Sequence, residues 1–174
     1  MFEVRVHGRG GQGVVTAAEL LSVAAFSEGR HAQAFPSFGS ERTGAPVVAY
    51  CRIADHEIRT RAPIVRPDAV IVQDATLLGQ LPVLEGLREN GIVLVNSTQD
   101  VPGIVVPATE IALELVGRPV PNAALLGAFA AASGIVSLTS VSAAIRERFH
   151  AEVAEANIAA ATRAFEIVQE YQHA

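Results

Sequence analysis

Residues 2–27 read Phe-Glu-Val-Arg-Val-His-Gly-Arg-Gly-Gly-Gln-Gly-Val-Val-Thr-Ala-Ala-Glu-Leu-Leu-Ser-Val-Ala-Ala-Phe-Ser. The first six residues alternate between apolar and polar side chains, which predicts a β-strand. Four glycines follow within six positions, and residues 14–27 then contain neither Pro nor Gly, which predicts a helix. A strand, a glycine-rich turn and a helix in this order are typical of an α/β fold that binds a ligand at the turn.

The rest of the chain continues this alternation of strands and helices. Apolar runs between turn residues predict strands at 31–35, 47–53, 68–73, 91–96 and 104–106. Helices are predicted at 77–90, 109–116, 122–133, 141–149 and 151–171, with Thr109 and either Thr139 or Ser140 as N-caps. The turn at 54–56 predicts a small hairpin whose second strand is 57–61. Continuous apolar strands between helices indicate a parallel sheet that is covered on both faces.

We therefore expect one domain, residues 1–174, of the α/β class. It should be Rossmann-like, with a mainly parallel sheet flanked by helices, a small hairpin excursion and a helical C-terminal third. Of the 174 residues, 50% are apolar and 18% are charged, which supports a real core. The mean hydropathy of +0.33 leaves two interpretations open, a tightly packed Ala-rich core or apolar surface that faces a partner subunit.

Charge and cysteine content exclude several classes of protein. The net charge is −5 and there is no basic run, so we expect no nucleic-acid partner. No apolar run approaches the roughly 20 residues of a membrane span, and no export signal is evident, so we expect a cytoplasmic protein without membrane contact. The single cysteine, Cys51, excludes an internal disulfide and a four-cysteine cluster, and its strand position predicts a buried, inert thiol.

The glycine-rich turn is the first candidate binding site. Gly8, Gly10 and Gly13 fit the pattern G-x-G-x-x-G, which lets a phosphate approach backbone N–H groups and the positive end of the next helix. Arg9 could add a bidentate contact. The alternative is that the glycines only allow the helix to pack on the strand. A nicotinamide cofactor is disfavoured because residues 32–36 lack the acidic residue that binds a ribose.

A second candidate is the loop 36–46, which is dense in Gly, Ser and charge. It carries Phe38, and Phe35 precedes it, and a free loop would rarely expose such rings. Glu41 and Arg42 therefore either dock on a partner chain or belong to a solvated loop. His7 could contact a phosphate or serve as a structural histidine.

Three segments together resemble one family. They are Gly10-Gly-Gln-Gly13, the stretch Phe35-Pro-Ser-Phe-Gly-Ser-Glu-Arg-Thr-Gly-Ala-Pro46, and Pro121-Asn-Ala-Ala-Leu-Leu-Gly-Ala128, with Ala156-Asn157 as a further match. The chain resembles the γ subunit of 2-oxoacid:acceptor oxidoreductases. The second segment is similar to the pyruvate, ketoisovalerate and aryl-oxoacid branch, although Thr43 stands where that branch usually has a second arginine.

The resemblance implies a function within a complex that oxidises a 2-oxoacid and coenzyme A to an acyl-CoA and CO2. It implies that this chain holds no catalytic residue, no metal and no tightly bound cofactor. Thiamine diphosphate, Mg and iron–sulfur clusters are expected on α and β subunits and on a ferredoxin-like subunit. A phosphate of coenzyme A, a shared substrate, is expected on Gly8, Arg9, Gly10, Gly11, Gln12, Gly13 and Arg42. Contacts with partner subunits are expected from Phe35, Phe38, Gly39, Glu41 and Arg42.

Two rival functions remain open at this stage. The chain could be a stand-alone Rossmann enzyme that uses a nucleotide. It could also be a scaffold subunit that binds no ligand.

Overall fold

A computed structural model describes residues 1–37 and 43–174 of the chain. Its centre is a six-stranded sheet with the strand order β2-β3-β1-β4-β5-β6. The strands are β1 (Phe2–Arg9), β2 (His31–Pro36), β3 (Pro46–Ala54), β4 (Ala69–Val72), β5 (Ile92–Asn96) and β6 (Ile104–Val106). The helices are α1 (Val14–Ser27), α2 (Ala108–Leu115), α3 (Asn122–Ser133), α4 (Leu138–Arg148) and α5 (Ala151–His173).

The sheet is mixed, with parallel pairing on one side of β1 and antiparallel pairing on the other. β1, β4, β5 and β6 run parallel to one another. β3 runs antiparallel to both β1 and β2. The predicted α/β class is confirmed. Because β1, β4 and β5 are parallel, their carboxyl ends meet at one edge of the sheet, where ligands bind in folds of this kind.

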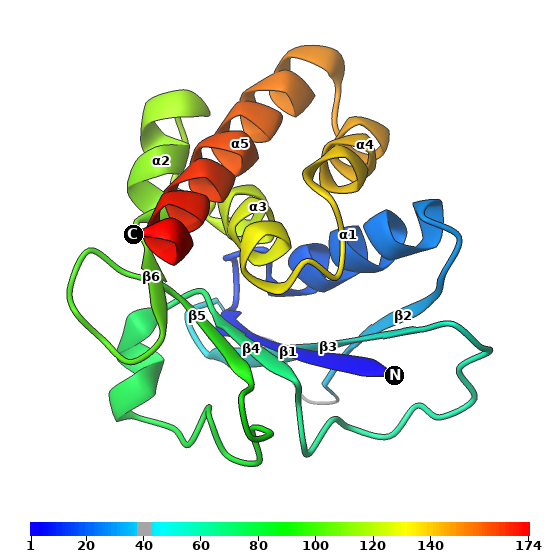
Figure 1. The fold of residues 1–174 in the computed structure, drawn as a ribbon. Coiled ribbons are helices and arrows are strands. Elements are labelled where there is room, and N and C mark those ends of the chain that lie inside the picture. The colour runs from blue at the N-terminus through cyan, green and yellow to red at the C-terminus, as the bar shows by residue number, and fades with distance from the viewer. Residues whose placement is uncertain (38–42) are drawn as a thin grey trace.

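All five α-helices cover the same face of the sheet (Figure 1). Helix α3 lies inside this layer, because its Ala-rich sequence lets neighbouring helices approach on every side and its residues 122–130 are all buried. The closest approach is to α5, where a Cβ added at Gly127 would overlap the backbone carbonyl of Ala161. The small residue at position 127 therefore sets the distance between α3 and α5.

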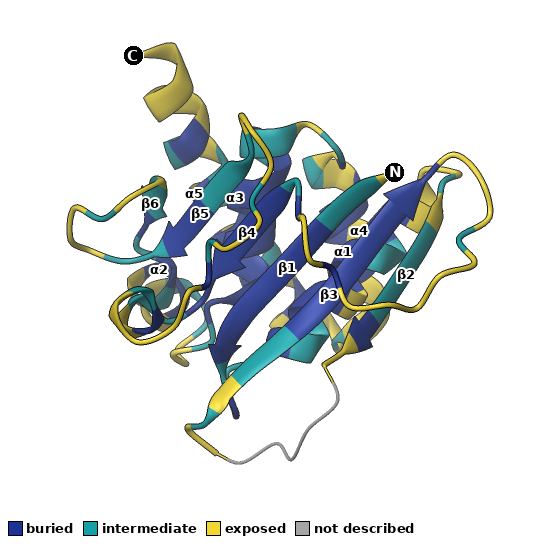
Figure 2. Cartoon of the chain, turned by 90° about the horizontal axis from the view of Figure 1, so that it is seen from below, coloured by how far each residue is buried: buried dark blue, intermediate teal, exposed yellow. Residues whose placement is uncertain are grey.

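The opposite face, shown in Figure 2, is covered by irregular segments, and two sequence predictions fail there. Residues 77–90 do not form an α-helix, since only a short 3-10 helix, η1 (Ala75–Gly79), is present. Pro82 lacks the N–H that a helix needs, and Gly86 adopts a φ of +80° beside the backbone of Val65. Residues 57–61 form no strand, so the predicted hairpin is wrong as well.

A buried arginine holds these irregular segments under the sheet. The Arg5 guanidinium donates to the backbone carbonyls of Ile64, Val83 and Glu85 at 3.3, 2.9 and 2.6 Å. Carbonyls that a regular helix or strand would pair are satisfied here by one side chain. The long-range partner explains why local sequence patterns mispredict both segments.

Two predicted helix caps also differ. Thr109 lies inside α2, and its hydroxyl accepts a hydrogen bond from Nδ2 of Asn96 at 2.8 Å. Helix α4 is capped by Ser137, whose side chain accepts from the Ser140 N–H. Within residues 1–37 and 43–174, none of the helices is both long and apolar enough to cross a membrane.

Candidate functional site

The glycine loop joins β1 to α1 and is pinned to the segment that leads into β3. The Gly10 N–H donates to the Ala45 carbonyl at 2.8 Å, and the Gly44 N–H donates to the Gly10 carbonyl at 3.1 Å. Gly13 is the N-cap of α1 with a φ of +73°, and no side chain of the described residues caps that helix. The first N–H groups of α1 therefore face the space in front of the loop.

The glycines of the loop serve different purposes. A Cβ at Gly8 would lie 2.5 Å from Cγ2 of Val14, so this glycine allows the helix to pack on the strand. Gly11 has a φ of +92° and open space around its missing Cβ. A Cβ at Gly13 would lie 2.8 Å from Nδ2 of Asn122. The packing interpretation thus holds for Gly8, whereas Gly11 faces outward and Gly13 faces the start of α3.

Arg9 is engaged by the chain itself. Its Nε donates to Asp74 at 3.2 Å and its Nη1 to the Gly44 carbonyl at 3.1 Å. Its Nη2 donates to Thr76 and Gln80 at 2.9 and 2.8 Å. A phosphate at Arg9 would have to displace these acceptors, so the structure gives this residue the role of a clamp between the glycine loop and the segment after β4.

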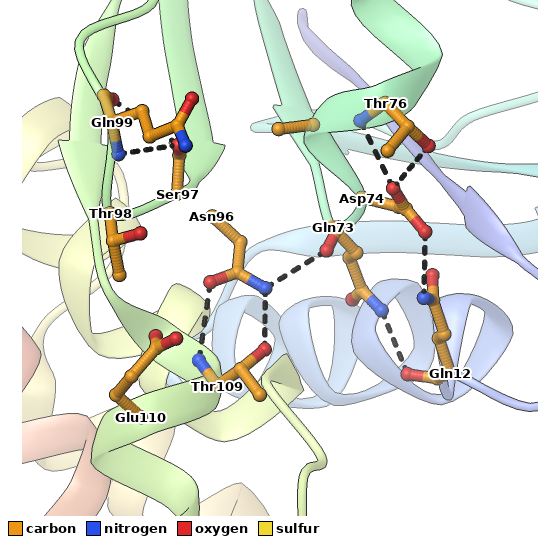
Figure 3. A pocket seen from close by; sticks show the side chains of 11 residues that line it. Gln12, Gln73, Asp74, Thr76, Asn96, Ser97, Thr98, Gln99, Thr109 and Glu110 are labelled. Atoms are coloured by element: carbon orange, nitrogen blue, oxygen red, sulfur yellow. Dashed lines mark hydrogen bonds between the residues drawn. The ribbon is translucent and has the colours of Figure 1, made fainter.

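One cavity opens on the Gln12 side of the loop, at the carboxyl ends of β4 and β5 (Figure 3). It has a volume of about 420 Å³ and is called the acidic cavity here. Gln12 Nε2 donates to Asp74, and the Gln12 carbonyl accepts from Gln73 Nε2 at 2.8 Å. The lining residues are Gln12, Gln73, Asp74, Ala75, Thr76, Asn96, Ser97, Thr98, Gln99, Thr109 and Glu110.

The charged side chains of this cavity are both carboxylates, Asp74 and Glu110. Burial opposes ionisation of Asp74, but hydrogen bonds from Thr76 and Gln12 and the charge of Arg9 together lower its pKa below the usual range. Asp74 is therefore ionised and paired. The cavity as a whole presents negative charge and does not suit a phosphate.

A second cavity opens on the Gly11 and Gly13 side of the loop, and is called the basic cavity here. It has a volume of about 240 Å³ and lies where the first turns of α1 and α3 meet the end of α4 and the start of α5. Its charged side chains are Arg118 and Arg148, and none of its described lining residues is a carboxylate. Arg148 forms one long, exposed ion pair with Glu19 at 3.6 Å, which a phosphate could replace more easily than the four acceptors around Arg9. The lining residues are Gly11, Gly13, Thr16, Val116, Arg118, Val120, Asn122, Arg148, Phe149, Val153 and Asn157.

Asn122 gives this cavity a buried donor. The residue is 3% exposed, and its Oδ1 accepts from the Ala123 N–H at 2.9 Å. The amide nitrogen Nδ2 therefore faces Gly13 and the cavity, and it donates to none of the described residues. The motif at 121–128 pointed to this segment, but sequence reasoning gave Asn122, Arg118 and Arg148 no role, because they converge only in the folded chain.

The remaining candidates fall into two groups. Phe35 is 6% exposed and packs on Tyr50 with ring centroids 5.1 Å apart, so the chain itself covers the ring that we expected at an interface. Phe38, Gly39, Glu41 and Arg42 lie outside the described residues.

The other two singled-out side chains are buried in strands. Burial, together with the charge of Arg5, lowers the pKa of His7 to about 4, so His7 is a neutral structural residue. Burial raises the pKa of Cys51 to about 12, which confirms the inert thiol.

The fold is an α/β domain whose glycine loop lies between two cavities, which is an architecture typical of ligand-binding domains. Residues 3–167 match the model of the family described as pyruvate ferredoxin/flavodoxin oxidoreductase, and the chain belongs to this family. The pyruvate synthase subunit PorC of Methanocaldococcus jannaschii is 49% identical over 98% of this chain and 99% of its own length. The common γ subunit of the pyruvate/ketoisovalerate oxidoreductases of Pyrococcus abyssi is 47% identical over 99% of this chain and 100% of its own.

The solved structures that resemble this chain are also subunits of 2-oxoacid oxidoreductases. The crystal structure of the pyruvate oxidoreductase subunit PORC of Thermotoga maritima is 41% identical, covers 95% of both chains and superposes with a TM-score of 0.84. The γ subunit of a keto/oxoacid ferredoxin oxidoreductase from Geobacter sulfurreducens is 27% identical, covers 98% of this chain and 99% of its own, and has a TM-score of 0.80. The predicted function, a γ subunit of a multi-subunit 2-oxoacid oxidoreductase, is thereby confirmed.

Proposed function

We propose that the chain assembles with thiamine-diphosphate-binding α and β subunits and an iron–sulfur subunit, and that its basic cavity holds a phosphate of coenzyme A. One observation carries the second part. The cavity combines two arginines, the first turns of two helices and the Asn122 amide, and no carboxylate of the described residues lines it. This is the donor set that a phosphate prefers.

The glycine loop contributes through its backbone. Gly11 and Gly13 line the basic cavity, and their positive φ values turn the loop toward it. A side chain at either position would strain the backbone that brings N–H groups to the ligand. The proposed phosphate site therefore keeps Gly11 and Gly13, whereas Gln12 lines the acidic cavity, and the cationic partner moves from Arg9 to Arg118 and Arg148.

The chemistry itself belongs to the partners in this proposal. Thiamine diphosphate and iron–sulfur clusters on those chains would supply decarboxylation and electron transfer. The contribution of this chain is to bind and orient coenzyme A, which raises the effective concentration of its thiol at the reacting centre. The end of the substrate that carries the phosphates provides binding energy remote from the reacting atoms.

The test uses the assembled complex with Arg118→Ala or Arg148→Ala in this chain. Each exposed arginine that contacts a phosphate should raise the KM for coenzyme A about 10-fold, which corresponds to about 1.4 kcal/mol. The KM for the 2-oxoacid should not change. Arg146→Ala is the matched control for Arg148→Ala, because Arg146 also lies on α4 and pairs with Glu155 outside the cavity.

Two outcomes would favour the rivals. If both variants keep the KM for coenzyme A in an intact complex, the chain is a scaffold at this site. If the isolated chain binds a free nucleotide tightly and turns over without partners, it is a stand-alone nucleotide-dependent enzyme.

A further inference from the structure

The acidic cavity plays no part in the proposed binding of coenzyme A. Its lining includes a buried hydrogen-bond acceptor that has no donor among the described residues, Oε1 of Gln73. Gln73 is 1% exposed, and its Nε2 donates to the Gln12 carbonyl at 2.8 Å, which fixes the orientation of the amide. The other amide atom, Oε1, is buried and has no partner among the described residues. A buried acceptor without a donor is costly, so the site calls for a donor from outside the chain.

The Asn96 side chain, which lies opposite Gln73, is fixed by hydrogen bonds, so it cannot rotate to donate to Gln73 Oε1. Asn96 Nδ2 donates to the Gln73 carbonyl at 3.0 Å and to the Thr109 hydroxyl at 2.8 Å (Figure 3). Asn96 Oδ1 accepts from the Thr109 N–H at 3.2 Å. Both polar atoms of the Asn96 side chain are thereby used, and the cavity keeps a fixed shape.

The negative charge of the acidic cavity indicates which kind of group can bind in it. Asp74 is paired with Arg9 at 3.2 Å, and the Glu110 carboxylate at the exposed rim forms no ion pair with any described residue. No Lys, Arg or His lines the cavity within the described part of the chain. A cation satisfies both conditions at once, because it donates hydrogen bonds and pairs with the carboxylate of Glu110.

The lining also indicates that the cation belongs to a protein. Pockets for small molecules are lined mainly by apolar and aromatic side chains, whereas Ala75 is the only apolar residue among the eleven that line this cavity. A small cationic molecule would meet no apolar side chain here other than Ala75. A basic side chain of a docked protein does not depend on such contact, because the rest of the interface supplies the affinity.

We propose that the acidic cavity receives an arginine or lysine side chain from a partner subunit of the complex, which donates to Gln73 Oε1 and pairs with Glu110. The carboxyl edge of β4 and β5 is then a subunit interface. This inference rests on the role as a subunit and is independent of the assignment of coenzyme A to the basic cavity.

The test measures assembly in the full set of subunits, with Glu110→Lys or Glu110→Gln in this chain. Charge reversal at a docked ion pair should weaken the association by at least about 10-fold, and Glu110→Gln should weaken it less. The salt dependence of association should become shallower in Glu110→Gln, because one charge pair is lost. Glu166→Lys is the control, since Glu166 is an exposed carboxylate on α5 away from the cavity.

A third variant addresses the buried acceptor. Gln73→Leu removes the unpaired oxygen and also the hydrogen bond to the Gln12 carbonyl, so it should weaken assembly and leave the melting temperature of this chain close to that of the wild type. If Gln73→Leu fails to fold, the Glu110 variants decide alone. Assembly of Glu110→Lys with wild-type affinity and wild-type salt dependence would overturn the proposal, as would a small molecule that co-purifies in the cavity of the intact complex. A changed KM for coenzyme A with unchanged assembly would bear on the proposed function instead.

Discussion

Replacement of Gly13 by alanine places a methyl group between the glycine loop and the start of α3. Gly13 has a φ of +73°, and an alanine Cβ there would lie 2.8 Å from Nδ2 of Asn122. Gly29→Ala is the matched control. Gly29 has a φ of +85° at the end of α1, and nothing lies within 4 Å of its missing Cβ.

The magnitude follows from two contributions. An alanine in the left-handed region costs about 1–2 kcal/mol, and this cost is common to both variants. The lower entropy of the unfolded chain returns about 0.4–1 kcal/mol in both. Only Gly13→Ala adds a clash with a side chain that is 97% covered, and overpacking of this kind costs about 1–3 kcal/mol.

The assay is urea unfolding of the purified chain, followed by circular dichroism. Gly13→Ala should be less stable than Gly29→Ala by about 1–3 kcal/mol, which is the cost of the clash alone. In the assembled complex, Gly13→Ala should also raise the KM for coenzyme A, whereas Gly29→Ala should not. Equal stability of the two variants would refute the contact between Gly13 and Asn122 and with it the geometry of the basic cavity.

Two further predictions concern the core. Because the folded pKa of His7 is about 4 and its unfolded value is 6.5, the unfolded chain binds the proton first, and stability should fall by about 2 kcal/mol between pH 7 and pH 5. His7→Gln should abolish most of this loss, and an unchanged pH profile in that variant would exclude the role of His7. Gly127→Ala should lower the melting temperature by roughly 4–8 °C, which corresponds to about 2 kcal/mol, because the new Cβ meets the backbone carbonyl of Ala161. This clash should outweigh the better helix propensity of alanine. A melting temperature equal to or above that of the wild type would contradict the close approach of α3 and α5.

The sequence predicts well what local patterns determine. Helix α1 has the predicted bounds Val14–Ser27, because its glycine-rich start and the Gly29 end are local signals. The buried helix α3 also has its predicted bounds, Asn122–Ser133. Both helices follow from residues within one segment, which is why periodicity and composition suffice.

Segments that are held by distant partners escape such reasoning. Residues 77–90 contain apolar residues at helical spacing, but Gly86 and the side chain of Arg5 stabilise an irregular course instead. Arg9 of the predicted site is likewise held by distant partners. Its charge suggested a phosphate contact, whereas Asp74, Thr76 and Gln80 come from a segment 65 to 71 residues further along the chain.

The basic cavity could not be predicted as a site, because its residues are far apart in the sequence. Arg118 follows α2, Asn122 begins α3 and Arg148 ends α4, and they meet only when the helices pack on one face of the sheet. The family resemblance directed attention to the glycine loop and to the segment at 121–128. The structure shows in addition that the positive charge lies on the Gly11 and Gly13 side of the glycine loop.

The central claim is that the basic cavity binds the phosphates of coenzyme A in the assembled complex. The most direct measurement compares coenzyme A with pantetheine, which carries the same thiol without phosphates, as acyl acceptors of the complex with Arg118→Ala and Arg148→Ala combined. The account predicts that the ratio of kcat/KM for coenzyme A to that for pantetheine falls about 100-fold, since two contacts worth about tenfold each are lost, while kcat/KM for pantetheine is unchanged. A ratio equal to that of the wild-type complex would contradict the claim.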